Sequence, residues 1–479
     1  MLLLFRKSGA SNIPRQAPLV LRLPVWYNQN TSGCSLVEEG DDCGVFRAHG
    51  DLFSETTVRF WGSSPKAVFW KGQDIAMKQV VLLCDGMADT PCALLGGRTP
   101  MEAANKPAMD ALARASEVGL AKTVPDGMAP GSDVANLSVL GYNPKDCYTG
   151  RSPLEAANIG IQLADEDVAL RCNLVTLSDD PVYEEKTLTD YCAGDIHTAD
   201  ADRLIQEIQA AFGGGEFDFY TGTAYRHCLV WHGGQTELGR VTPPHDITGR
   251  VIGPYLMIHP AAAKLRRMME MSYDLLRDHP LNRERIARGQ NPANAIWLWG
   301  QGRRPRLQSF QERFGAQGAM ISAVDLLKGI GRLTGMTVCQ IPGATGYIDT
   351  DYEAKRDAAL QELRAGRDLA YIHVEAPDEC GHRGETENKV QAIEDIDRRI
   401  LAPLLNELKK MGDYAVLIMP DHPTPLALRT HTADPVPYLL YRSGRDRESS
   451  VDRFTEQAAA STGVFVERAD ALMGRLLGR

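Results

Sequence analysis

Residues 79–86 have the sequence Gln-Val-Val-Leu-Leu-Cys-Asp-Gly, a largely apolar run that ends on an acidic residue and a glycine. Such a run is typical of a strand that is buried on both faces, as the strands of a parallel sheet are. Strand-like runs recur at residues 368–375 and 414–419, and residues 106–117 and 388–409 have the apolar spacing of helices. Because strands and helices alternate, the sequence predicts an α/β fold with a parallel sheet between layers of helices.

The middle of the chain has structural units of its own. Two strand-like runs and two helical patterns lie there, at residues 171–177, 225–231, 200–212 and 261–277. We therefore predict a smaller α/β domain at residues 150–312, inserted into a larger domain that consists of residues 77–149 and 313–479.

The first 76 residues differ from the rest, because they contain several prolines and a polar stretch but no clear hydrophobic period. We hypothesise that residues 1–76 are either a poorly ordered extension or translated upstream sequence, with Met77 as the functional start. Several acidic residues within this segment, among them Glu38, Glu39, Asp41 and Asp42, disfavour a transit peptide.

Charge and composition limit the classes of partner. The 479-residue chain carries a formal net charge of −10 and contains no basic run, so we expect neither a nucleic-acid nor a membrane partner. A small anionic substrate can still bind where basic side chains and metal ions gather. The ten cysteines form no Cys-x-x-Cys pair, which favours free thiols in a reducing, cytoplasmic compartment. The sequence leaves both a monomer and a homo-oligomer open.

Three acidic residues follow three of the strand-like runs: Asp85, Asp378 and Asp421. The carboxyl ends of parallel strands meet at one edge of a sheet, where ligand sites gather. A single acid in this position is usually a cap or turn residue. Three of them, with histidines adjoining two of them in the chain, favour a shared site.

Histidines lie close to two of these acids. His382 follows Asp378 by four residues, His422 is adjacent to Asp421, and His431 lies nine residues further on. Each histidine alone is more often a surface or core residue. Carboxylate and imidazole together suit Mn²⁺, Zn²⁺, Co²⁺ or Mg²⁺, and with Ser132 the set has enough donors for two ions.

Ser132 lies in the segment Pro-Gly-Ser-Asp-Val-Ala-Asn, residues 130–136. Its ordinary role would be to cap a helix. The same position offers free N–H groups and positive potential to a phosphate, and a coordinated metal would activate the hydroxyl as a nucleophile.

Basic residues in the middle of the chain are candidates for binding phosphate and carboxylate groups. Each alone is more often a solvated surface charge, although the glycine-rich surroundings of two of them favour close approach of the backbone to a ligand. The candidates are Arg151, Arg226, Arg303 and Lys328, together with Asp133 beside the serine.

Together with the sequence around them, the candidate residues resemble the alkaline phosphatase superfamily, and within it the archaeal type of 2,3-bisphosphoglycerate-independent phosphoglycerate mutases. The resemblance runs in the family's order from about Met77 to Tyr441, and residues 1–76 are outside it. It is carried by LLCDGMAD, VPDGMAPGSDVANLSVLGYNP, YTGRSPLEAANIGI, WLWGQGRRP, ISAVDLLKGIGRL, PGATGYIDT, VEAPDECGH and MPDHPTPLALRTHTADPVP. It implies an alkaline-phosphatase-like core with an inserted substrate-binding domain.

The resemblance also implies a division of labour among the candidate residues. One metal ion, most often Mn²⁺, would be held by Asp378, His382 and His431. The other would be held by Asp85, Asp421, His422 and the oxygen of Ser132. Ser132 would accept the phosphoryl group of 3-phosphoglycerate and return it to the 2-hydroxyl, without 2,3-bisphosphoglycerate, as a step of glycolysis and gluconeogenesis. Lys328 resembles the family's phosphate-neutralising lysine, and the inserted domain would keep water from the phosphoserine.

Three other functions remain open from the sequence. A homoserine-kinase-like phosphotransferase would share the metal centre and differ only in its acceptor. A metal-dependent phosphatase or phosphodiesterase of the same superfamily would transfer the group to water. A non-enzymatic binding protein is disfavoured, because the serine and the full set of ligand candidates are present.

Overall fold

The computed structural model describes residues 77–444 and 451–479 in full, and before residue 77 it describes only the backbone of five strands. The chain divides into two units, Met1–Ala76 and Met77–Arg479. In the first unit, β1 (Leu2–Leu3) pairs with β2 (Leu21–Arg22), and an antiparallel sheet consists of β3 (Cys34–Glu39), β4 (Cys43–Gly50) and β5 (Phe53–Trp61). The hypothesis of a poorly ordered extension or upstream sequence concerns segments that lie outside the described residues, and it stays a prediction.

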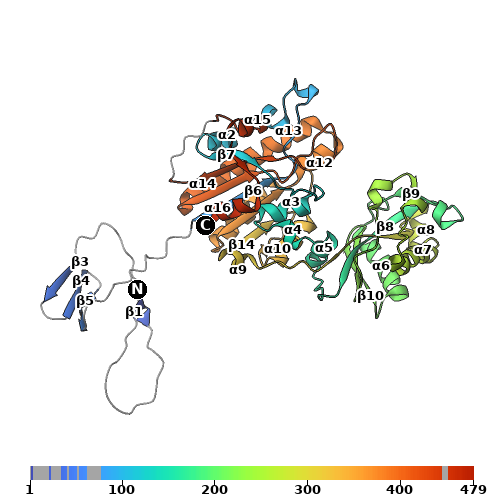
Figure 1. Ribbon diagram of the computed structural model, residues 1–479, viewed down its shortest axis with the longest axis horizontal. Coiled ribbons are helices and arrows are strands. Elements are labelled where there is room, and N and C mark those ends of the chain that lie inside the picture. Colours follow the sequence, from blue (N-terminus) through green and yellow to red (C-terminus); the bar gives the residue numbers. More distant parts are fainter. Residues whose placement is uncertain are drawn as a thin grey trace, which may run out of the picture. The chain divides into compact units, whose positions relative to one another are not determined.

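The second unit contains an eight-stranded sheet with β6 near its centre (Figure 1). In spatial order the strands are β15 (Thr337–Val338), β14 (Gly318–Ile321), β16 (Leu369–Val374), β6 (Lys78–Cys84), β17 (Tyr414–Met419), β18 (Val436–Arg442), β7 (Glu117–Ala121) and β19 (Phe465–Val466). Among these eight strands only β18 runs against its neighbours. The predicted parallel sheet is confirmed, with one reversed strand that we did not predict. No helix between β17 and β18 carries the chain back to the end of the sheet where β17 begins. Strand β18 therefore runs antiparallel to β17.

The apolar run that starts the sheet is buried on both faces. Val80 and Leu82 of β6 pack into one hydrophobic core, whereas Val81 and Leu83 pack into a second core on the opposite face. Side chains alternate across a strand, so a strand covered on both sides needs apolar residues at every position. This requirement explains why residues 79–84 show no polar alternation.

Helices cover both faces of this sheet (Figure 1). The first core includes residues of α1 (Pro100–Ala103), α2 (Pro107–Ala113), α11 (Tyr352–Arg364), α12 (Ala376–Arg383), α13 (Thr386–Asp395), α14 (Ala402–Met411) and α15 (Glu456–Ser461). The second core includes residues of α3 (Ser132–Val139), α4 (Pro144–Cys147), α5 (Ser152–Asn158), α9 (Phe310–Phe314), α10 (Asp325–Leu333) and α16 (Asp470–Leu477). The predicted layers of helices on either side of the sheet are confirmed.

The helix predicted at residues 388–409 is interrupted. A π-helical segment, Ile396–Leu401, lies between α13 and α14. Pro403 has no backbone N–H and therefore cannot donate to the carbonyl group of Arg399, as a helical residue would. The Nη1 atom of Arg356 donates to that carbonyl oxygen instead, at 3.1 Å.

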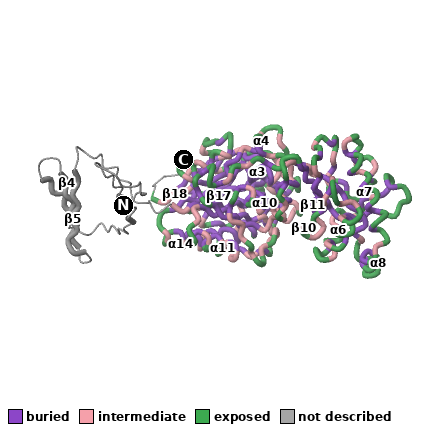
Figure 2. Tube along the Cα trace, turned by 90° about the horizontal axis from the view of Figure 1, so that it is seen from below, coloured by how far each residue is buried: buried purple, intermediate pink, exposed green. Residues whose placement is uncertain are grey.

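A second sheet lies within residues 168–303 and has its own hydrophobic core. Strand β8 (Val168–Leu177) pairs antiparallel with its neighbours, and the other strands are β9 (Thr187–Asp190), β10 (Phe217–Thr223), β11 (Arg226–Trp231), β12 (Arg250–Val251) and β13 (Ala295–Arg303). The helices are α6 (Thr198–Phe212), α7 (Ala263–Leu276) and α8 (Pro280–Ala287). Figure 2 shows that buried residues lie in the interior around each of these two sheets and that exposed residues lie on the outside. The domain boundaries at residues 150 and 312 stay a prediction.

Two further properties concern only the residues that the structure describes. None of their helices is both long enough and apolar enough to cross a membrane. Their eight cysteines are free thiols.

We expect a chain that starts at Met77 to fold as well as the full-length protein, because elements of Met77–Arg479 cover both faces of its sheet. Its thermal midpoint should lie within about 1 °C of the full-length value, which corresponds to less than about 1 kcal/mol for a unit of this size. Differential scanning calorimetry measures this. A chain that starts at Asp85 is the control and should not fold, because it lacks the strand between β16 and β17. Loss of folding on removal of residues 1–76 alone would contradict the expectation.

Candidate metal centre

The three acids lie together at the carboxyl ends of three adjacent parallel strands of the large sheet. Asp85 directly follows β6, Asp378 lies in the first turn of α12 after β16, and Asp421 follows β17 by two residues. Their exposed fractions are 1%, 5% and 0%. Strands β16, β6 and β17 are neighbours with matching registers, so the turns after them converge.

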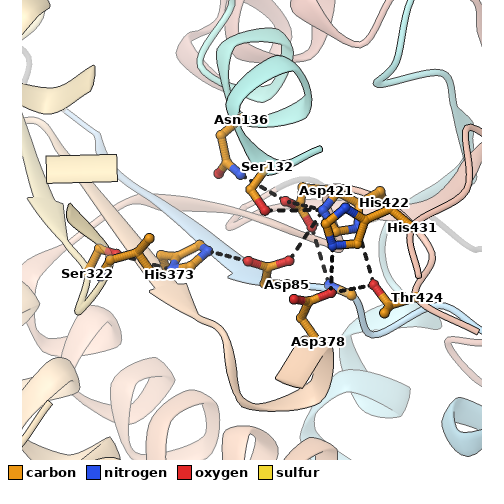
Figure 3. Close-up of polar contacts among 12 residues, drawn as sticks. Asp85, Ser132, Asn136, Ser322, His373, Asp378, Asp421, His422, Thr424 and His431 are labelled. Atoms are coloured by element: carbon orange, nitrogen blue, oxygen red, sulfur yellow. Dashed lines mark hydrogen bonds and ion pairs between the residues drawn. The ribbon is translucent and has the colours of Figure 1, made fainter. Parts of the chain in front are cut away.

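The inner cluster consists of Asp85, Asp421 and His422, whose nearest ligand atoms lie within 4.8 Å of one another. The Nε2 atom of His422 is 3.3 Å from Asp421 Oδ2 and 3.7 Å from Asp85 Oδ1. Ser132 lies at the first position of α3, and its Oγ is 3.2 Å from the same Nε2 (Figure 3). Gly131 holds the N-cap position, so the serine hydroxyl faces the cluster and does not cap the helix.

The outer cluster consists of Asp378, His382 and His431. The Nε2 atoms of the two histidines are 2.9 Å apart, and they lie 3.2 Å and 3.4 Å from the two carboxylate oxygens of Asp378. His382 is one-third exposed, whereas the inner cluster is fully buried. His422 also lies within 4.8 Å of Asp378 and His431 and therefore joins the two clusters.

Hydrogen bonds to the remaining ring nitrogens imply which tautomers the histidines adopt. The Nδ1 atom of His382 faces the carbonyl oxygen of Arg429 at 3.0 Å and must donate to it. Thr424 Oγ1 donates to Asp378, so it accepts from His422 Nδ1 at 3.3 Å. In their neutral forms, both rings would therefore direct an unprotonated Nε2 into the clusters, as metal ligation requires.

The electrostatics of the inner cluster fit a cation. Burial and the neighbouring Asp421 raise the pKa of Asp85 well above its ordinary value. Asp85 Oδ1 is buried and has no hydrogen-bond partner, which is costly for a carboxylate oxygen. A divalent cation would satisfy this oxygen and offset the repulsion between the acids.

In the outer cluster the pKa of the acid is shifted in the opposite direction. Burial alone would raise the pKa of Asp378, but hydrogen bonds from His382 and His431 hold it well below its ordinary value. The same contact with Asp378 raises the pKa of His382 to about 9. Imidazole donors thus partly neutralise this acid, and they would have to give up their protons to a metal ion.

The predicted basic residues divide into two groups. Arg151 and Arg226 line one pocket with Glu155 and Asp325. Arg226 Nη2 lies 3.7 Å from Asp325 Oδ2, and Lys328 Nζ lies 3.8 Å from Asp325 Oδ1. These three cations therefore surround shared acidic partners between α5, β11 and α10.

Arg303 is placed apart from that group. Its guanidinium donates to the carbonyl oxygens of Gly234 and Asp165, at 2.8 Å and 3.3 Å. Asp133 is 8% exposed and accepts a hydrogen bond from the hydroxyl of Tyr148 at 2.6 Å. Substrate-binding roles for both residues stay predictions.

A family model for 2,3-bisphosphoglycerate-independent phosphoglycerate mutase matches residues 113–282. A relative from Geobacter sulfurreducens, named a probable 2,3-bisphosphoglycerate-independent phosphoglycerate mutase, is 50% identical over 403 residues, which are 84% of this chain and all of the relative. The chain belongs to this mutase family. The mutase of Methanosarcina barkeri is 47% identical over 84% of this chain and 99% of that protein.

Solved structures agree with the membership. The cofactor-independent phosphoglycerate mutase from Thermoplasma acidophilum matches with a TM-score of 0.57 and 26% identity, over 84% of this chain and 99% of that one. A protein from Pyrococcus horikoshii matches with a TM-score of 0.68 and 27% identity, over 84% and 98% of the two chains.

In this member of the mutase family, several buried polar residues around the clusters were not predicted from the sequence. Asn136 Nδ2 donates to Asp421 Oδ2 at 2.9 Å (Figure 3). The hydroxyl of Tyr371 donates to Asn136 Oδ1 at 2.7 Å. Asn136 lies one helical turn after Ser132, on the same face of α3, and that spacing was an available signal. His373 was detectable as a lone histidine within an apolar strand. Burial lowers its pKa to about 3, so the ring is neutral.

We expect Asn136→Ala to destabilise the metal-free protein by about 1–3 kcal/mol, because the Tyr371 hydroxyl and Asp421 would both lose a buried partner. Guanidinium unfolding measures the loss. Tyr371→Phe should cost less in the Asn136→Ala background than in the wild type, because the hydroxyl is already unpaired there. Strictly additive losses in this double-mutant cycle would show that the two side chains do not act as a unit.

Proposed function

We propose that the chain interconverts 3-phosphoglycerate and 2-phosphoglycerate through a phosphoserine at Ser132, with two divalent metal ions and without 2,3-bisphosphoglycerate. The observation that carries the proposal is the position of the Ser132 hydroxyl, 3.2 Å from His422 at the start of α3 and beside buried carboxylates. The names of the relatives support the same reaction. The reaction belongs to glycolysis and gluconeogenesis, and we propose that it takes place in the cytoplasm.

The ligand atoms suggest how two ions would be divided. Asp85, Asp421, His422 and Ser132 would hold one ion in the inner cluster, and Asp378, His382 and His431 would hold the other. Mn²⁺ is our first choice, and Mg²⁺, Co²⁺ and Zn²⁺ also accept these donors. Such ions would lower the pKa of the serine hydroxyl and neutralise charge on the phosphoryl oxygens.

The bonds and protons exchanged in the two steps balance, because the 3-oxygen of the substrate gains a proton and the 2-hydroxyl loses one. The Ser132 oxygen forms a bond to phosphorus while the bond from phosphorus to the 3-oxygen of glycerate breaks, and that oxygen gains the serine proton. In the second step the 2-hydroxyl attacks the phosphoserine and returns a proton to Ser132. The N-terminus of α3 stabilises the phosphoryl group through free N–H groups and its dipole.

Residues of the inserted segment, together with Lys328 of the larger domain, would bind the glycerate between the two transfers. Arg151 and Arg226 provide forked donors suited to carboxylate, and Lys328 provides a point charge beside them. A mutase must keep water away while the glycerate re-orients, since water would otherwise release phosphate.

We expect Ser132→Ala to reduce the mutase rate by at least about 1,000-fold, because it removes the oxygen that would accept the phosphoryl group. Metal binding should largely survive, since the inner cluster keeps its two carboxylates and its histidine. An enolase-coupled assay with 3-phosphoglycerate and Mn²⁺ measures the rate, and isothermal titration measures the binding. Near-native activity of Ser132→Ala would exclude the covalent route.

The wild-type assay separates this proposal from its alternatives. Formation of 2-phosphoglycerate without phosphate release is the expected result. Phosphate release from several monoesters would instead indicate a phosphatase. Absence of 2-phosphoglycerate, with phosphoryl transfer to homoserine, would indicate a different acceptor.

We expect Mn²⁺ affinity to fall as the pH falls below about 9. The histidine ligands bind metal only when they are neutral, and the contact with Asp378 raises the pKa of His382 to about 9, so protons compete with the ion below that pH. Titration of the metal-free protein with Mn²⁺ at several pH values measures this dependence. A mutase rate that persists after removal of metal by a chelator would contradict the two-ion scheme.

A further inference from the structure

His373 lies in the middle of the large sheet, behind the inner cluster. It is the fifth residue of β16, is paired in register with Leu83 of β6, and is fully buried. An imidazole in such a place is costly unless both ring nitrogens have partners. Both do: Nε2 lies 2.8 Å from Asp85 Oδ2, and Nδ1 lies 3.1 Å from Ser322 Oγ (Figure 3).

The direction of these hydrogen bonds follows from the partners. Ser322 Oγ accepts from the backbone N–H of Val324 at 3.0 Å, so its own proton is free for His373 Nδ1. When Asp85 is ionised, as a metal ligand must be, Oδ2 can only accept, so the ring proton lies on Nε2 and donates to it, and Ser322 donates to Nδ1. Ser322 thereby selects the tautomer that can hold the carboxylate.

The backbone of His373 is also held in place. Lys355, which is fully buried on α11, donates from Nζ to the carbonyl oxygen of His373 at 3.2 Å. Because both the backbone and the ring of His373 are held by hydrogen bonds, the side chain of Asp85 that contacts the ring has little rotational freedom. One oxygen of Asp85 is taken by the ring, and Oδ1 is left without a partner beside His422.

We propose that His373 is a positioning residue that donates from Nε2 to Asp85 Oδ2, so that Oδ1 faces the divalent cation of the inner cluster. Ser322 fixes the required tautomer. The inference rests on the proposed function, because it takes Asp85 to be a metal ligand. A donor behind a ligand both orients it and limits its motion, and removing such a donor typically weakens metal binding about 10–100-fold.

The test uses two polar replacements of similar chemistry but different reach. The amide nitrogen of His373→Gln can occupy the place of Nε2 and donate to Asp85. The amide of His373→Asn ends near the place of Nδ1, so it can contact Ser322 but not Asp85. The full-length proteins, stripped of metal, are titrated with Mn²⁺ by isothermal calorimetry, with free Mn²⁺ followed by electron paramagnetic resonance.

We expect His373→Asn to bind Mn²⁺ about 10–100-fold more weakly in one of two sites, with the other site unchanged. His373→Gln should recover most of that affinity, and Ser322→Ala should show a smaller loss than His373→Asn. Guanidinium unfolding of the metal-free variants is the control for a purely structural role, which would lower stability in His373→Asn without a selective loss at one site.

Two results would overturn the inference. Two-site binding by His373→Asn within about twofold of the wild type would mean that the contact does not influence the ion. Equal losses in His373→Asn and His373→Gln would mean that hydrogen-bond donation to Asp85 is not the cause. Failure of the wild-type protein to bind any divalent ion would instead refute the proposed function on which the inference rests.

Discussion

The carboxylates of Asp85, Asp378 and Asp421 repel one another in a region from which the protein excludes water. The parallel register of β16, β6 and β17 brings their carboxyl ends to the same level and forces this proximity. Neighbouring donors offset part of the repulsion: His373 and Asn136 donate to two of the acids, and Thr424 donates to the third. The oxygen of Asp85 that has no partner among these donors is the remaining imbalance, and a cation would correct it.

The proximity of the acids also requires that the loop after β17, which contains three of the ligand candidates, be held in place by buried hydrogen bonds. Lys389 is fully buried and donates from Nζ to Asp89 Oδ2 at 2.7 Å and to the carbonyl oxygen of Thr424 at 2.8 Å. Asp89 in turn accepts from the backbone N–H of Leu426. Losing one partner of such a buried pair costs about 3–5 kcal/mol. The pair therefore fixes the loop in which His422 and Thr424 turn toward the acids.

Much of the fold and of the metal centre was predictable because the signals are local. A strand buried on both faces must be apolar throughout, and residues 79–84 satisfy that rule within one short run. The reversed strand β18 and the π-helical segment before Pro403 were not predictable from periodicity. The first depends on the absence of a returning helix. In the second, the carbonyl group of Arg399 accepts a hydrogen bond from Arg356, a residue 43 positions away in the chain. His373 and Asn136 escaped notice because a buried polar residue reveals its purpose only when its partner is known.

The residues that would recognise the glycerate depend still more on tertiary packing. Glu155 of α5 binds Arg151 at 3.0 Å on the same helix face and Arg171 of β8 at 2.6 Å. Arg171 also lies over the ring of Trp299 from β13, at 4.7 Å, and burial lowers its pKa to about 10. No short motif contains these partners, since they come from three elements that only the folded second sheet brings together. The candidate metal ligands occupy a few short segments, and a rule about the ends of parallel strands predicts where they gather. On the proposed function, acceptor choice would depend instead on how Arg151 and Arg171 share Glu155, because a guanidinium already paired with that carboxylate has fewer donors left for a substrate carboxylate.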